Sequence, residues 1–145
     1  TIPNARLVIQ KREWEAGHVS ELIEANSFIP ADYDHGHEVI QVDGAHDLFG
    51  DGTVVIKYAP GHTPGHQMLF LKLAKLGPVL LAGDLYHFPE ERTLDRVPTF
   101  DGDREMTRRT RKDVEVFLKQ AGAQLWIEHD ETTHAKLKKS PAFYD

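Results

Sequence analysis

The sequence predicts a mixed α/β (α+β) domain in which helices flank a β-sheet. Runs of β-branched and aliphatic residues at 39–42 and 54–58 are bounded by Gly and Asp, which is typical of strands. An amphipathic segment at 102–121 predicts a long helix, and an apolar run at 125–128 follows it directly. Strands in hairpins, followed by one strand reached through a helix, favour a sheet of mixed direction.

The first quarter of the chain is predicted to begin with a buried strand. Leu7, Val8 and Ile9 make a short apolar run. Residues 11–25 have mixed helical character, which a glycine near their centre interrupts. Residues 27–37 contain a proline and a glycine in a polar setting and are therefore expected to form a loop.

The middle of the chain is expected to supply the rest of the hairpin strands. Asp–Gly sequences, which tolerate positive φ, separate the first two runs, and Gly77-Pro78 joins the last two. These strands are expected at 39–42, 54–58, 68–73 and 79–82.

The predicted long helix has recognisable signals at both ends. Asp101 or Asp103 can cap its start, and Gly122 occupies the position favoured beyond a helix C-terminus. Apolar residues recur at helical spacing and predict one face that packs on the core. These residues are Met106, Val114, Phe117, Leu118 and Ala121.

Composition limits the classes of function. A chain of 145 residues fits one domain, and its net charge of −6 disfavours nucleic acid or anionic membranes as partners. It has no cysteine, so any metal must be bound by nitrogen and oxygen ligands. With no apolar run of about 18 residues and no signal peptide at its start, we expect a cytoplasmic protein.

Three candidate metal ligands each follow an expected strand. His62 lies in the heptapeptide Pro60-Gly61-His62-Thr63-Pro64-Gly65-His66, whose prolines and glycines can hold an imidazole in a fixed position. Asp84 follows the run that ends at 82, and His129 follows the run at 125–128. Imidazole and carboxylate groups from separate elements are the ligands of zinc-type hydrolase sites, so we expect these three side chains to converge.

Each candidate has a structural alternative. Asp84 can instead cap the segment after it, and His129 can be an exposed turn residue with Asp130 as its orienting partner. We expect His66 to make hydrogen bonds beneath the loop rather than to bind a metal. His35 and His37 have His-x-His spacing, but they lie in a polar loop and are expected to be solvated.

Two further residues are candidate catalytic groups. Tyr86 and His87 follow Asp84 closely enough to face the same site, where either can polarise a carbonyl or stabilise an oxyanion. For Tyr86 the alternative is a packing residue. The basic residues at 104–112 lack interleaved aromatic residues, so we interpret them as a solvated helix face and not as a nucleic-acid site.

At these residues the chain resembles the metallo-β-lactamase superfamily, and in particular its N-acyl homoserine lactonase branch. Residues 51–67, with the heptapeptide, are similar to that branch's third metal motif and the hairpin before it. Leu81-Ala82-Gly83-Asp84 is similar to its bridging-aspartate strand, and Glu128-His129-Asp130 to its final metal histidine. The resemblance covers residues 4–138.

The resemblance implies half of an αββα sandwich and a site for two metal ions, with Zn²⁺ expected and Mn, Fe or Co as alternatives. It implies that His62 binds the first metal, that His129 binds the second and that Asp84 joins both. It further implies that a metal-bound hydroxide attacks a lactone, ester or amide. Asp84, with Tyr86 or His87, is then the expected catalytic group.

The chain departs from the family pattern in two ways. Family members carry a His-x-His-x-Asp-His motif upstream of the first strand, and nothing in residues 1–145 matches it, so the chain resembles the C-terminal half of such an enzyme. The lactonase branch also places a catalytic tyrosine three residues after the bridging aspartate. Here His87 holds that position, and Tyr86 precedes it.

We therefore expect a single domain at 1–145 that is part of a metallo-hydrolase with a small-molecule substrate and is inactive as this chain alone. Three ligands are too few for two metal ions. The alternative is a non-catalytic, self-associating module, because half of a sandwich leaves an apolar sheet face uncovered. The expected partners are a second copy of the chain or the missing N-terminal half.

Overall fold

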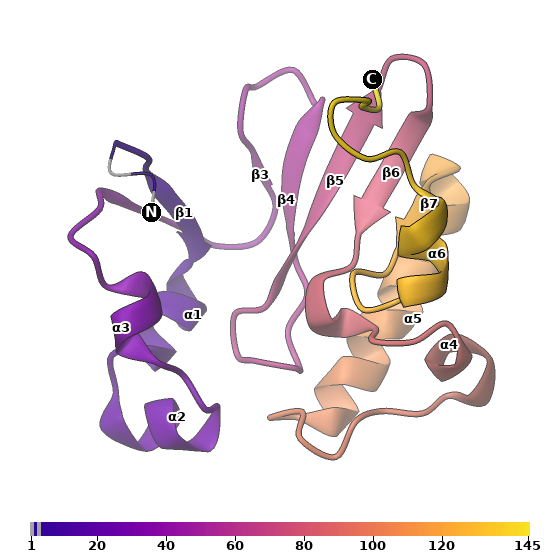
Figure 1. Ribbon diagram of the computed structural model, residues 1–145. Helices are drawn as coiled ribbons and strands as arrows, with labels where there is room; N and C mark the ends of the chain where they lie inside the picture. The colour runs from indigo at the N-terminus through magenta and orange to yellow at the C-terminus, as the bar shows by residue number, and fades with distance from the viewer. Residues whose placement is uncertain (1, 3) are drawn as a thin grey trace.

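The computed structural model describes residues 2 and 4–145 and contains two sheets (Figure 1). A parallel pair, β1 (Leu7–Gln10) and β2 (Val39–Val42), stands apart from a five-stranded sheet of order β3-β4-β5-β6-β7. All neighbours in the larger sheet are antiparallel except β6 and β7. Its strands are β3 (His46–Asp47), β4 (Val54–Tyr58), β5 (Gln67–Leu73), β6 (Gly77–Leu81) and β7 (Gln124–Trp126).

Helices lie on both sides of the larger sheet. In Figure 1 the first three gather with β1 and β2 on one side, and the last three lie on the other. A short 3₁₀ turn, η1 (Gly83–Leu85), follows β6. The helices are α1 (Lys11–Ala16), α2 (Ser20–Ala25), α3 (Pro30–Tyr33), α4 (Glu90–Leu94), α5 (Arg104–Ala121) and α6 (Glu131–Lys136).

The main core lies between α5 and one face of the larger sheet. Val114 and Leu118 of α5 are buried with Met68, Phe70 and Leu80, whose side chains share that face because their strand positions pair across the sheet. The Asp103 side chain caps α5 by accepting a hydrogen bond from the Met106 amide, and Gly122 ends the helix in the left-handed region. Of the predicted core-facing residues, Val114, Phe117, Leu118 and Ala121 lie in or against this core, whereas Met106 is not among its residues. The C-terminal signal at Gly122 is confirmed.

The opposite face of the sheet is also apolar but less well covered. Ile56 and Val79 are buried there, whereas Leu69, Leu71 and Leu81 are half-buried. The N-terminal sheet contacts this face where the Gln67 side chain donates to the Val8 carbonyl, and the C-terminal segment contacts it where Tyr144 packs against Trp126.

The mixed sheet is confirmed, with differences in detail. The expected helix at 11–25 is two short helices, α1 and α2, separated at Gly17, and the expected loop at 27–37 contains α3. Strand β2 pairs with β1 and not with β4, because residues 43–53 lead into the additional strand β3, which forms the hairpin. The elements β3, α4, η1 and α6 are too short to give a periodic pattern in the sequence.

The strand register brings three connecting segments together at one end of the strands. Tyr58 pairs with Gln67 across the β4–β5 hairpin, so residues 59–66 form its loop. Leu81 at the end of β6 pairs with Leu69 near the start of β5 and with Trp126 at the end of β7. The β4–β5 loop and the segments after β6 and β7 therefore meet there, below the sheet in Figure 1.

The β4–β5 loop is packed against α1 without space for another side chain. A Cβ atom at Gly65 would lie 2.3 Å from the backbone nitrogen of Glu13. We expect Gly65→Ala to lower the free energy of unfolding by about 3 kcal/mol, at the upper end of overpacking costs. Gly77→Ala is the control, because its site is open and only its positive φ opposes a side chain, at about 1 kcal/mol. Equal losses in chemical denaturation would contradict this account.

Candidate metal centre

The loop that carries His62 is fixed from two sides. The Glu13 carboxylate accepts hydrogen bonds from Thr63 Oγ1 and from the Gly65 amide, both at 2.6 Å. On the other side, Gly61 has φ of +137°, and a Cβ atom there would lie 2.4 Å from Thr107 Oγ1 of α5. Only glycine therefore fits at this contact. The loop has little freedom to move, as the Pro–Gly pattern predicts.

His62 is oriented by a buried carboxylate. Its Nδ1 atom lies 3.0 Å from Oδ1 of Asp101, whose side chain is fully buried and accepts a second hydrogen bond from Thr107 Oγ1 at 2.7 Å. The bond to Asp101 is the main reason that the pKa of His62 is raised. With Nδ1 engaged in this way, Nε2 points toward Asp84 Oδ2 at 3.8 Å.

His66 lies beneath the loop, as expected, and positions Asp84. Its Nδ1 donates to the Ala59 carbonyl at 2.9 Å, and its Nε2 accepts from the Asp84 amide at the same distance. Burial lowers the pKa of His66, so the ring is held in the neutral form that this pair of bonds requires. His66 therefore acts as a spacer between the loop and η1.

Asp84 presents its two carboxylate oxygens to different imidazoles. Oδ1 accepts a hydrogen bond from His129 Nε2 at 2.7 Å and lies 3.7 Å from His87 Nε2, whereas Oδ2 faces His62. Burial alone would raise the pKa of Asp84, but the bond to His129 and the neighbouring imidazoles together lower it. The carboxylate is thus ionised and lies between two sets of nitrogen donors.

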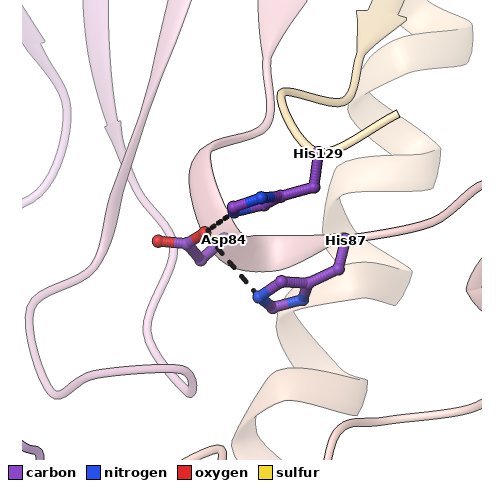
Figure 2. A group of neighbouring side chains, drawn as sticks. All are labelled: Asp84, His87 and His129. Atoms are coloured by element: carbon purple, nitrogen blue, oxygen red, sulfur yellow. Dashed lines mark hydrogen bonds and ion pairs between the residues drawn. The ribbon is translucent and has the colours of Figure 1, made fainter. Parts of the chain in front are cut away.

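Three of these side chains form a compact group. Figure 2 shows Asp84, His87 and His129 converging from η1, the segment after it and the segment after β7. One ligand atom from each lies within 4.8 Å of the others. The rings of His87 and His129 stack at 5.0 Å with 20° between their planes. Mixed nitrogen and oxygen donors at this spacing fit a divalent metal ion.

The structure thus brings together His62, Asp84, His87 and His129, but it does not bring Tyr86 to them. The Tyr86 ring is buried, its hydroxyl donates to Glu115 Oε1 at 3.1 Å, and the Arg111 guanidinium lies 4.4 Å above the ring centre. Burial raises the pKa of the phenol. Tyr86 occupies the packing position that the sequence left as its alternative, since consecutive residues in an extended segment point in opposite directions.

Three residues of the site were not anticipated from the sequence. Asp101 was considered only as a helix cap, a role that falls to Asp103, and its hydrogen bond to His62 depends on the packing of α5. Glu91 lies behind His87, with 3.9 Å between Glu91 Oε1 and His87 Nδ1. Phe100 is 68% exposed and places its ring 5.3 Å from that of His87.

The other expected polar residues have separate roles. Asp130 caps α6 by accepting a hydrogen bond from the Thr133 amide at 3.1 Å, so it does not orient His129. His35 and His37 lie near each other between α3 and β2, with ring centres 6.3 Å apart, outside the group around Asp84.

Comparison of the sequence with curated proteins finds similarity to N-acyl homoserine lactonases. The chain is 31% identical over 148 residues to the N-acyl homoserine lactonase AttM of Azorhizobium caulinodans, a match that covers 99% of the chain and 56% of AttM. It is 28% identical over 127 residues to the lactonase AiiA of Bacillus thuringiensis subsp. kurstaki, covering 88% of the chain and 48% of AiiA. No protein-family profile matches the chain. The chain is thus similar to N-acyl homoserine lactonases over nearly its whole length.

Structural comparison agrees with this relationship. A lactone hydrolase solved with the product N-hexanoyl-L-homoserine at its catalytic metal centre superposes with a TM-score of 0.82 and 25% identity, over 99% of this chain and 54% of that one. The expected fold of the metallo-β-lactamase-type lactonases is thereby confirmed. The chain spans about half the length of the curated relatives it matches.

One general property is separate from the site. No helix within residues 2 and 4–145 combines the length and the apolar character needed to span a membrane.

The bond between His62 and Asp101 predicts a pH dependence in the metal-free chain. Because the folded state raises the pKa of His62, its contribution to stability is complete below the ordinary value of about 6.5 and is lost as the pH rises through the raised value. NMR titration in chelator should place the His62 pKa above that value, and Asp101→Asn should lower it. Asp103→Asn, which retains a capping side chain, is the control and should leave the His62 titration unchanged.

Proposed function

We propose that this chain forms the C-terminal, metal-binding half of a metal-dependent hydrolase that opens lactones, with esters and amides as the wider substrate class. The observation that supports this most directly is the arrangement of Asp84, whose two oxygens face His62 on one side and His87 with His129 on the other. A carboxylate with nitrogen donors on both sides is suited to join two cations.

The residues of the chain have defined tasks in this proposal. His62 would bind the first metal through Nε2, because Asp101 occupies its Nδ1, and His129 would bind the second. Asp84 would contact both. When bound, the divalent cations polarise a carbonyl and lower the pKa of water, so that a nucleophile is available near neutral pH. We propose Zn²⁺, although Mn, Fe and Co accept the same donors.

A lactone substrate is supported by the relatives and by the surroundings of the site. AttM and AiiA are named N-acyl homoserine lactonases, and the solved hydrolase holds the product N-hexanoyl-L-homoserine at its catalytic metal centre. Beside the donors of this chain, the exposed ring of Phe100 lies 6.0 Å from His62 and gives an apolar wall for a small molecule. Of the two expected catalytic groups after Asp84, only His87 faces this space.

The count of ligands suggests that further residues are needed for activity. His62, Asp84 and His129 are three donor side chains for two metals, whereas a catalytic zinc site uses about three protein ligands for one. The relatives are nearly twice as long as the matched region, and the partly covered sheet face at Leu69 and Leu71 can accept a second layer. We therefore propose that the missing ligands lie outside these 145 residues and that the chain alone is inactive.

The same sheet face favours a second candidate, a non-catalytic module that self-associates. Half-buried apolar residues on an incompletely covered sheet are typical of surfaces that bind another chain. Two copies would then bury this face against each other. A monomer in light scattering at micromolar concentration would contradict this alternative, whereas the hydrolase proposal does not depend on the oligomeric state.

The decisive test of the hydrolase proposal is lactone hydrolysis by the protein expressed with its flanking coding sequence and supplied with Zn²⁺. Asp84→Asn should reduce kcat/KM by about 100-fold or more. Replacing a residue that only orients a metal ligand already costs up to about 100-fold, and Asp84 would be a ligand itself. Tyr86→Phe is the matched control two residues away. It should retain activity and lose about 1 kcal/mol of stability with its bond to Glu115.

Two results would contradict the proposal. If Asp84→Asn remained active, or if the protein remained active in excess chelator, the reaction would not depend on a metal bound at Asp84. A large loss of kcat in Tyr86→Phe with normal stability would show that Tyr86 is a catalytic residue. It would contradict the packing role that its burial in the core indicates.

A further inference from the structure

We propose that His87 is a metal ligand, so that Asp84, His87 and His129 form a three-ligand site carried entirely by this chain. This inference builds on the proposed metal centre but goes beyond it, because it assigns His87 to the metal and not to the substrate. The site would take a divalent ion that accepts imidazole and carboxylate donors, such as Zn²⁺ or Co²⁺.

The distances are suited to such a site. Ligand atoms around a tetrahedral ion with bonds of about 2.0 Å lie roughly 3.3 Å from one another. The three donors lie within 4.8 Å, with His129 Nε2 at 2.7 Å and His87 Nε2 at 3.7 Å from Asp84 Oδ1. Figure 2 shows the nitrogen of each ring directed to the same oxygen. Small rotations of the side chains are enough to admit an ion among them.

The surroundings of His87 also resemble those of a metal-bound imidazole. Ligating histidines usually direct their second nitrogen to a carboxylate or a carbonyl. Nδ1 of His87 faces Glu91 Oε1 at 3.9 Å, as Nδ1 of His62 faces Asp101. Glu91 is held in place by Arg111, whose Nη2 donates to Glu91 Oε2 at 2.6 Å, and by the His87 amide at 3.1 Å.

Within the part of the chain that the structure describes, the Nδ1 atom of the enclosed His87 ring has no hydrogen bond, although Glu91 lies close to it. The His87 side chain is only 12% exposed, and among the described residues its Nδ1 is one of two buried side-chain polar atoms without a hydrogen bond. Burying a polar nitrogen without a hydrogen bond costs free energy of folding, so such an arrangement is unusual unless the group has a function. An ion bound at Nε2 requires the proton on Nδ1, where Glu91 can accept it after a shift of about 1 Å.

The consequence is a site that has the usual count of protein ligands for catalytic zinc. With only His62, Asp84 and His129, the chain offers one imidazole to each metal, and neither would be firmly bound. Adding His87 gives the metal beside His129 two imidazoles and a carboxylate, with a fourth position left for water or substrate. His87 occupies the position of a tyrosine in the lactonase pattern, and imidazole is a stronger ligand than a neutral phenol.

The test is metal binding by the 145-residue chain after removal of metal with chelator. Zn²⁺ titration by calorimetry should give one strong equivalent, and Co²⁺ should give the visible absorption of a low-symmetry nitrogen and oxygen site. His87→Phe, which keeps a flat ring without a donor, should weaken Zn²⁺ binding at least tenfold. The double variant His35→Gln/His37→Gln is the control and should bind as the wild type, because that pair lies outside the group.

A second measurement covers the case in which His87→Phe does not fold. In the wild-type chain, NMR of the imidazole nitrogens should show the Nε2 resonance of His87 moving on addition of Zn²⁺ together with that of His129. Unchanged affinity in folded His87→Phe, no Nε2 shift at His87, or no strong equivalent at all would overturn the inference. None of these outcomes concerns lactone hydrolysis, so the hydrolase proposal is judged separately by the activity of Asp84→Asn.

Discussion

The site depends on the placement of one carboxylate, that of Asp84, in the turn η1 that follows β6. Its backbone amide is tied to His66, and His66 is tied to the carbonyl of Ala59 at the start of the β4–β5 loop. Asp84 is therefore linked through its amide to the loop that carries His62, and its carboxylate oxygens lie between His62 and His129. Because β6 is an inner strand of the sheet, the position of Asp84 follows from the core and is not left to a flexible loop.

Behind the donor atoms lies a second set of charges that the core holds in place. Asp101 bonds to His62 and Thr107, and Glu91 bonds to Arg111 and faces His87. Thr107 and Arg111 lie one helical turn apart on α5, so a single helix stabilises both orienting carboxylates. Packing of α5 on the sheet and orientation of the imidazoles are thus parts of one arrangement.

The sequence was sufficient for the features that follow from position along a strand or helix. The ends of β6 and β7 placed Asp84 and His129 at one edge, and the Pro–Gly loop placed His62 beside them. It was not sufficient for contacts between distant segments. Whether Tyr86 or His87 faces the site depends on how the turn after η1 packs over α5, and the role of Asp101 depends on its distance from His62 in space. Neither of these two contacts produces a periodic pattern of residues in the sequence.

The bonds from Glu13 to the β4–β5 loop connect segments about fifty residues apart in the chain. Because the Gly65 amide donates to Glu13, we expect its hydrogen to exchange with solvent when α1 separates from the loop. We therefore expect the β1–α1 segment and the end of the β4–β5 loop near Gly65 to open together, whereas the bond from His62 to Asp101 continues to tie its imidazole to the α5 side.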